Sequence, residues 1–176
     1  MKLDIGCGKT KRPGFTGVDI LALDGVDIVH DLNKFPYPFQ DSSVDEIWMD
    51  QVLEHVENPL AVVQELFRIC KAGANVTIGV PYFRGRYSVI DPTHRNFFGV
   101  DWFSYFDPRH IFHQRYAYCD ATFQVQKIEF DREYTKASKI RSLFVLLANK
   151  KPVWYEEKIS HLVPMNSLTF HLSAVK

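Results

Sequence analysis

Short apolar runs that end in a glycine or a carboxylate recur through the first half of the chain. Each run is three to seven residues long and is followed by polar or turn-forming positions, a pattern typical of strands with buried side chains. We therefore predict strands over residues 3–5, 17–20, 28–31, 44–49 and 75–81. Two further runs near the end of the chain predict strands over residues 123–128 and 167–175.

One segment between these strands has helical periodicity instead. Asn58 can cap the helix, and Pro59 suits its first position, where the missing N–H costs nothing. Gly73 can end the segment. The apolar positions that recur every three or four residues are Leu60, Val63, Phe67 and Cys70. The sequence thus predicts a helix between the fourth and fifth strands.

A glycine turn after the first strand and a carboxylate after the second indicate a nucleoside site. Gly6 and Gly8 would let the backbone bend sharply and approach a ligand, and Asp19 could accept hydrogen bonds from a ribose diol. A dinucleotide fold is disfavoured, because Lys9 and Thr10 follow where a third glycine is needed. Asp19 also arrives well before the ~20 positions expected for a dinucleotide ribose contact. A nicotinamide oxidoreductase is therefore disfavoured.

Several longer runs together carry a family resemblance. From residue 3 to about residue 83, the chain resembles the class I S-adenosylmethionine-dependent methyltransferases, specifically the small type 11 group. The runs that carry it are DIGCG, GVDI, HDLNKFPYPFQDSSVDEIW, VLEHVENP, ELFRICKAG and VTIGVPYF. Beyond them, the likeness is limited to Asp91–His94 and a final strand.

The resemblance implies a cofactor and its binding residues. The cofactor would be S-adenosylmethionine, with S-adenosylhomocysteine as product. Asp4, Gly6 and Gly8 would surround its methionine part, and Asp19 would hold the ribose hydroxyls. Asp31 and the Leu32 backbone would meet the adenine. Asp4 and Asp31 could equally cap turns through nearby backbone amides. Because Lys9-Thr10 departs from the family pattern, contacts to the cofactor carboxylate stay open, with Lys9 and Arg12 as possible counter-ions.

The expected fold class is α/β, with a Rossmann-like, doubly wound, mostly parallel seven-stranded sheet and an antiparallel last strand. The crossovers before the second and third strands are too short for a helix, since a parallel crossover usually takes a dozen or more residues. A parallel sheet is normally buried on both faces, so another segment should cover the exposed one. We expect the insert at about 135–166 to do so, within its own subunit or in a homodimer. Its apolar helical face comprises Ile140, Leu143, Phe144 and Leu147, and is broadened by Val145 and Leu146.

Composition is consistent with one domain over residues 1–176, with 46% hydrophobic residues and equal numbers of basic and acidic residues. The balanced charge does not favour a nucleic-acid partner. No apolar run is long enough to span a bilayer, and the first strand leaves no room for a signal peptide, so we expect a cytoplasmic location. Three scattered cysteines predict free thiols.

A second insert, residues 84–121, lies where the family places substrate-binding structure. It is rich in aromatic side chains, which could form the walls of an acceptor site or an ordinary core. It also contains His110 and His113 in an HxxH spacing, but with no convincing third ligand. We therefore expect no metal site.

The expected reaction is methyl transfer to a small-molecule or sugar- or lipid-linked acceptor. It needs alignment and water exclusion, and a base only if the acceptor must lose a proton early. His94 is the first candidate base and Asp50 the second, whereas His55 is expected to be structural. The alternative is a non-catalytic cofactor-binding subunit with a regulatory or scaffolding role.

Overall fold

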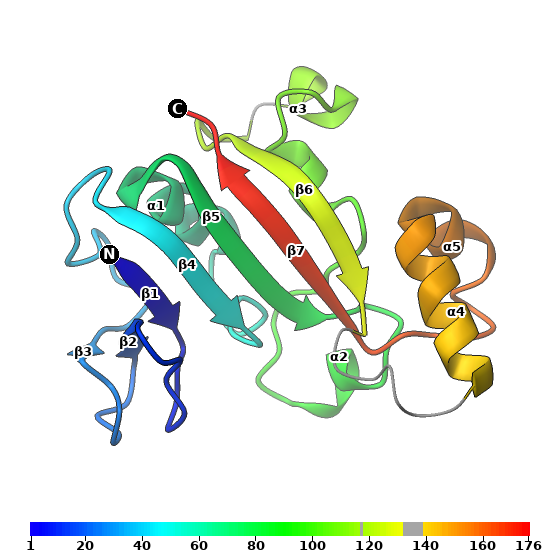
Figure 1. Ribbon diagram of the computed structural model, residues 1–176, viewed down its shortest axis with the longest axis horizontal. Helices are drawn as coiled ribbons and strands as arrows, with labels where there is room; N and C mark the ends of the chain where they lie inside the picture. The colour runs from blue at the N-terminus through cyan, green and yellow to red at the C-terminus, as the bar shows by residue number, and fades with distance from the viewer. Residues whose placement is uncertain (117, 132–138) are drawn as a thin grey trace.

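A seven-stranded mixed sheet forms the centre of the protein (Figure 1). The computed structural model describes residues 1–116, 118–131 and 139–176, and only the backbone of residues 139 and 140. The strand order is β3-β2-β1-β4-β5-β7-β6, and β7 runs antiparallel to both of its neighbours. The predicted antiparallel last strand is confirmed. The strands are β1 (Lys2–Ile5), β2 (Thr16–Asp19), β3 (Ile28–Val29), β4 (Val44–Asp50), β5 (Cys70–Pro81), β6 (Phe123–Phe130) and β7 (Ser167–Ala174).

The helices lie after β4 in the sequence, so the short early crossovers are loops, as predicted. Helix α1 begins as expected: the Asn58 side chain accepts a hydrogen bond of 3.1 Å from the Ala61 amide, and Pro59 is the first helical residue. The helices are α1 (Pro59–Ile69), α2 (Tyr87–Ile90), the 3-10 helix η1 (Trp102–Tyr105), α3 (Ile111–Arg115), α4 (Lys139–Lys150) and α5 (Pro152–Lys158).

One face of the sheet carries the core. Alternate side chains of each long strand are fully buried, and they pack in one cluster with the buried side of α1. Since successive strand residues point to opposite faces, this pattern places every second residue on the covered side. The cluster includes Leu3, Ile5, Ile47, Met49, Val62, Leu66, Val76, Ile78, Leu168 and Phe170.

The other face of the sheet is polar. Lys2 and Glu46 are register partners on β1 and β4 and form an ion pair of 2.7 Å. Farther along the sheet, His171 Nε2 lies 2.7 Å from Glu129 Oε2. The Arg12 guanidinium stacks over the Trp48 ring at 3.3 Å from its centroid. These side chains remain partly exposed to water, so this face does not need an apolar cover.

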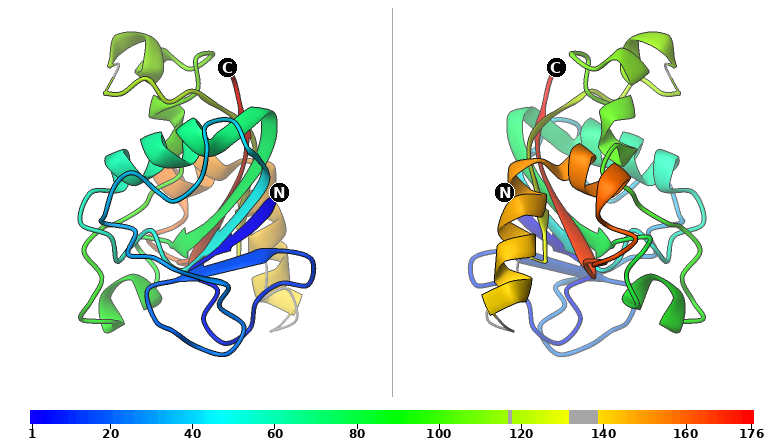
Figure 2. Two further views of the ribbon diagram at one scale, coloured as in Figure 1. Left: turned by 90° about the vertical axis from the view of Figure 1, so that its left-hand side faces the viewer. Right: turned by 90° about the vertical axis from the view of Figure 1, so that its right-hand side faces the viewer.

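The expectation that the insert at about 135–166 covers the exposed face is therefore wrong for all but its β6 edge. Figure 2 shows α1 on one side of the sheet and α4 on the other, near the β6 edge. There α4 packs on β6 and α5. Leu143 is 66% exposed and Leu146 68% exposed, whereas Val145 and Ala148 are buried. The Ile140 side chain lies outside the described residues. The predicted apolar face is thus buried only in part: Val145 is buried and Phe144 packs against the core, whereas Leu143 and Leu146 are exposed.

The physical reason can be read from the strands themselves. The β7 sequence SLTFHLSA alternates polar and apolar residues, with the apolar ones buried. Such alternation is typical of a sheet with one solvated face. This polarity also removes the reason for expecting a dimer mate on that face.

Two further sequence expectations concern membranes and thiols. Among the described residues, the structure contains no helix with the length and apolarity needed to cross a bilayer. Cys7, Cys70 and Cys119 are free cysteines, as predicted.

The unequal burial around α4 and α5 predicts a contrast in stability. Phe130 is fully buried, with its ring centroid 5.1 Å from Tyr82 and 4.9 Å from Tyr155. We expect Phe130→Ala to lower the free energy of unfolding by about 3–5 kcal/mol. Leu143→Ala should change it by less than about 0.5 kcal/mol, because that side chain is exposed. Urea denaturation measures both, and equal losses would contradict the observed packing of α4.

Candidate functional site

The turn after β1 brings the backbone close to the start of the segment after β4. Gly6 has φ +71°, and a Cβ there would overlap the Val52 side chain. The Gly6 amide donates to the Val18 carbonyl at 2.7 Å, which fixes the turn against β2. Only glycine fits this position, because other residues rarely adopt this φ and all of them carry a Cβ. The expected close approach at Gly6 is therefore present.

Asp19 ends β2 beside this turn. Its Oδ2 accepts from the Gly8 amide at 2.9 Å, and its Oδ1 accepts from the Leu21 amide at 3.0 Å. These two donors fix the carboxylate in one orientation. Each carboxylate oxygen can accept more than one hydrogen bond, so capacity remains for a ligand hydroxyl.

The loop after β3 supplies a second carboxylate. Asp31 Oδ1 accepts from the Asn33 amide at 3.0 Å and from Asn33 Nδ2 at 3.2 Å, an Asx turn of the kind expected as the alternative role. The Leu32 carbonyl accepts from the Tyr37 hydroxyl at 3.0 Å. Burial raises the pKa of Tyr37, so the hydroxyl keeps the proton that it donates. Asn33 Oδ1 accepts from the Glu57 amide at 2.8 Å, which joins this loop to the segment before α1.

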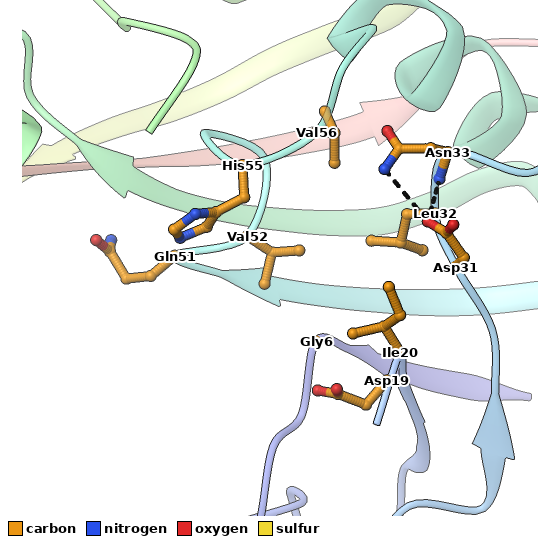
Figure 3. A pocket seen from close by; sticks show the side chains of 10 residues that line it. All are labelled: Gly6, Asp19, Ile20, Asp31, Leu32, Asn33, Gln51, Val52, His55 and Val56. Carbon is orange, nitrogen blue, oxygen red and sulfur yellow. Dashed lines mark hydrogen bonds between the residues drawn. The ribbon is translucent and has the colours of Figure 1, made fainter. Parts of the chain in front are cut away.

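These elements enclose a cleft of about 350 Å³ at the carboxyl ends of β1, β2 and β4 (Figure 3). Parallel α/β sheets bind ligands at this edge. Four of the six predicted cofactor-binding residues line it. The lining residues are Gly6, Asp19, Ile20, Asp31, Leu32, Asn33, Gln51, Val52, His55 and Val56.

The other two predicted residues support the walls from outside the cleft. Asp4 is 5% exposed, and its Oδ2 accepts from the Arg12 amide at 2.7 Å. Gly8 donates to Asp19. Arg12, a possible counter-ion in the sequence analysis, instead stacks on Trp48 at the polar face of the sheet. Asp4 and Gly8 therefore shape the loop that carries the lining residues.

The segment after β4 contributes residues that the sequence analysis missed. Gln51, Val52 and Val56 line the cleft, and His55, expected to be structural, lines it too. The predicted sheet could have indicated these residues, because β4 is parallel to β1 and adjacent to it, so the carboxyl ends of the two strands lie side by side. Asp50, the second candidate base, does not line the cleft. Its carboxylate lies over Gly79 on β5, where a Cβ on that glycine would overlap it.

His94, the first candidate base, lies behind His55. Their ring centroids are 4.7 Å apart, and the His94 side chain is 8% exposed. Burial and the neighbouring His94 lower the pKa of His55. Both rings face the carboxyl group of Glu54, which is fully buried. Burial, with smaller contributions from Asp50 and Asp91, raises the pKa of Glu54 to about 8.

The aromatic residues of the insert at 84–121 divide between the core and the surface. Phe98, Phe103 and Phe106 are buried, whereas Phe97 is 57% exposed. A separate hollow of about 200 Å³ is lined by Leu60, Trp102, Tyr105, Phe106 and Tyr118. The cleft of Figure 3 is lined by none of the insert's aromatic rings.

The HxxH pair has local roles. His110 Nδ1 accepts from the Phe112 amide at 3.2 Å and caps α3. His113 Nδ1 lies 3.0 Å from the Tyr105 carbonyl oxygen and donates to it. The described residues around them supply no further ligand that would complete a metal site with this pair.

Comparisons with known proteins agree with the fold. The methyltransferase domain family matches residues 3–78. No protein of curated function matches the chain in sequence. Among solved structures, a SAM-dependent methyltransferase from Archaeoglobus fulgidus is similar, with a TM-score of 0.55 and 19% identity over 98% of this chain and 85% of that one.

Two other structures extend this similarity. An S-adenosylmethionine-dependent methyltransferase from Mesorhizobium loti has a TM-score of 0.56 and 14% identity over 98% of this chain and 89% of that one. The [4+2]-cyclase SpnF has a TM-score of 0.57 and 16% identity over 99% of this chain and 74% of that one. The fold alone therefore does not define the reaction. Residues 3–78 thus match the methyltransferase domain family, and the whole chain shares the fold of S-adenosylmethionine-dependent methyltransferases, which implies S-adenosylmethionine as the cofactor.

Proposed function

We propose that the protein transfers the methyl group of S-adenosylmethionine to a small-molecule or sugar- or lipid-linked acceptor, and that the cofactor binds in the cleft of Figure 3. One observation carries this proposal: Gly6 and the Asp19 and Asp31 side chains line the same cleft. Their positions after three adjacent strands fit a ligand that lies across the sheet edge.

The chemistry of the lining residues fits the parts of the cofactor. Asp19 is held by two backbone amides and would accept from the ribose hydroxyls. Ile20 and Leu32 offer apolar surface for the adenine ring, with Asp31 at its polar edge. Gly6 would let the methionine part approach the backbone. We assign Asp4 and Gly8 a supporting role, since their contacts orient the loop.

The reaction asks little of side chains. When bound, the cofactor supplies a sulfonium that already activates the methyl group. The chain then has to align the acceptor and exclude water. His55 lies on the cleft wall, so it is the imidazole placed to receive a proton from an acceptor. We propose that His94 acts through His55, with which it is in ring contact, and that Asp50 is a weaker candidate.

A second candidate function is a non-catalytic cofactor-binding subunit with a regulatory or scaffolding role. The exposed Leu143 and Leu146 on α4 favour it, because large apolar side chains are less common at surfaces that face only water. The two functions differ in a simple assay. A catalytic protein transfers labelled methyl groups to an acceptor fraction, whereas a scaffold binds S-adenosylhomocysteine and transfers nothing.

Removing the Asp19 carboxylate should weaken cofactor binding. Asp19→Ala should cost about 1.5–3 kcal/mol of binding free energy for S-adenosylhomocysteine, as expected for hydrogen bonds to a charged group. Calorimetric titration measures this, with circular dichroism to verify folding. Asp24→Ala is the matched control, because Asp24 is exposed in the same loop region. An Asp19→Ala protein that binds like the wild type would remove Asp19 from the cofactor site.

Gly6 should be far less tolerant of a side chain than Gly14. Both have positive φ, +71° and +79°, so alanine strains the backbone at either position by about 1–2 kcal/mol. Only at Gly6 would the added Cβ overlap Val52; Gly14 faces open space. We expect Gly6→Ala to cost a further 1–3 kcal/mol or so of stability and to weaken S-adenosylhomocysteine binding. Gly14→Ala should keep its affinity; equal behaviour of the two variants would show that the contact with Val52 does not matter.

His94→Gln should impair turnover without impairing cofactor binding. His94 does not line the cleft, so affinity for S-adenosylhomocysteine should stay near that of the wild type. Turnover should fall by roughly 10²–10⁴-fold if the imidazole pair assists proton transfer. The acceptor is first identified in a screen with methyl-labelled cofactor. The control variant is His161→Gln, because His161 is exposed. Parallel loss of affinity and rate would make His94 a structural support instead.

A further inference from the structure

Glu54 is a buried carboxyl group whose oxygens have no hydrogen-bond partner among the described residues. It is 0% exposed, and neither of its carboxyl oxygens has a hydrogen bond to any residue that the structure describes. Burying a charged group without a partner is costly, so such groups are normally paired or coordinate a metal ion. The buried carboxyl group of Glu54 therefore suggests a ligand.

Two imidazoles face the same carboxyl oxygen. His94 Nε2 lies 3.9 Å from Glu54 Oε1, and His55 Nε2 lies 4.0 Å from it. Both distances exceed those of a hydrogen bond. The three potential ligand atoms lie within 4.8 Å of one another. They therefore surround a common point without bonding to each other.

The hydrogen bonds behind the rings determine which nitrogens are free to bind an ion. His94 Nδ1 lies 3.2 Å from the Ser88 carbonyl oxygen, which can only accept, so Nδ1 carries the proton. The Thr93 hydroxyl donates to Asp91 Oδ1 at 2.6 Å. It therefore accepts from His55 Nδ1, which lies 2.9 Å away. In the neutral state, both rings present an unprotonated Nε2 to Glu54.

This arrangement is typical of metal-binding histidines, whose second ring nitrogen donates to a carbonyl or to a polar group. Hydrogen bonds to backbone carbonyls hold the segment of Glu54 and His55 against the segment of His94. The Arg95 amide donates to the Glu54 carbonyl at 2.8 Å, and Asn96 Nδ2 donates to the Val56 carbonyl at 2.7 Å. The carboxylate of Asp91, with Oδ2 4.0 Å from His94 Nε2, adds negative charge that favours a cation.

We propose that Glu54, His55 and His94 form a binding site for a divalent transition-metal ion, with Zn²⁺ the best match to two imidazoles and one carboxylate. Tetrahedral Zn²⁺ with bonds of ~2.0–2.1 Å places its ligand atoms about 3.3 Å apart. The distances of 3.9 and 4.0 Å would then shorten modestly on binding. Such an ion would leave one position open beside the cleft, because His55 is on its wall.

A metal ion here would define the acceptor chemistry further. An acceptor hydroxyl bound at the open position would lose its proton to water more readily, because a metal ion lowers the pKa of an oxygen ligand. With the ion bound, His55 Nε2 would be a metal ligand, so this route would replace its role as proton acceptor. This consequence rests on the proposed methyl transfer. The metal site itself does not.

The test is metal binding by the full-length protein after removal of metal with a chelator. Isothermal titration with Zn²⁺ should give one site per chain, with Mn²⁺ and Fe²⁺ titrated in parallel to rank the ions. Glu54→Gln and His94→Gln keep the side-chain size and should each weaken binding by roughly 100-fold or more. Thr93→Val, which removes the contact behind His55 and the hydroxyl's bond to Asp91, should weaken it by roughly 10–100-fold. The His110→Gln, His113→Gln double variant should bind like the wild type.

Two results would overturn the proposal. One is a wild-type protein that binds none of the three ions at a stoichiometric site. The other is unchanged Zn²⁺ affinity in the Glu54→Gln and His94→Gln variants, because binding would then occur elsewhere. Visible absorption of the Co²⁺-substituted protein gives a second readout of ligand number, and His55→Gln replaces any variant that fails to fold. Metal binding without methyl transfer would overturn only the proposed function, whereas methyl transfer without metal binding would overturn only this inference.

Discussion

The contact between the Gly6 backbone and the Val52 side chain is the constraint on which the site depends. It joins the turn after β1 to the segment after β4, so it sets the distance between two walls of the cleft. The same turn places the Gly8 amide on Asp19, which orients the carboxylate at the end of β2. A side chain at position 6 would move both walls at once. The polar groups of the site are therefore positioned by close packing of the backbone.

The sheet shows how a parallel arrangement can remain stable with one solvated face. The early crossovers are too short for helices, and the strands compensate by alternating apolar and polar residues. Most strand positions, the capped start of the helix and the antiparallel last strand could be predicted from local patterns, but β5 begins at Cys70, inside the predicted helix. The packing of α4 could not be predicted in this way. We expected both faces of the sheet to be apolar, whereas the strands alternate apolar and polar residues. The exposed Leu143 is the clearest result of that error.

The candidate site could be predicted in part for a similar reason. Gly6, Asp19, Asp31 and Leu32 follow strands directly, so the sheet order brings them to one edge. Sequence proximity could not reveal that His94 lies against His55 and Glu54, because a loop some forty residues farther along the chain supplies it. Nor could it show that Asp50 lies over Gly79. Such contacts depend on how the loop of residues 91–96 folds back, and the pairing of Arg95 with the Glu54 carbonyl is part of that fold.

The central claim is that the cofactor occupies the cleft between the Gly6 turn and His55. A crystal structure of the protein with S-adenosylhomocysteine tests it most directly. The account predicts ribose hydroxyls at hydrogen-bond distance from Asp19, adenine beside Asp31 and Leu32, and the sulfur facing the wall formed by Val52 and His55. A ligand bound elsewhere, for example in the aromatic hollow at Trp102 and Tyr118, would contradict it.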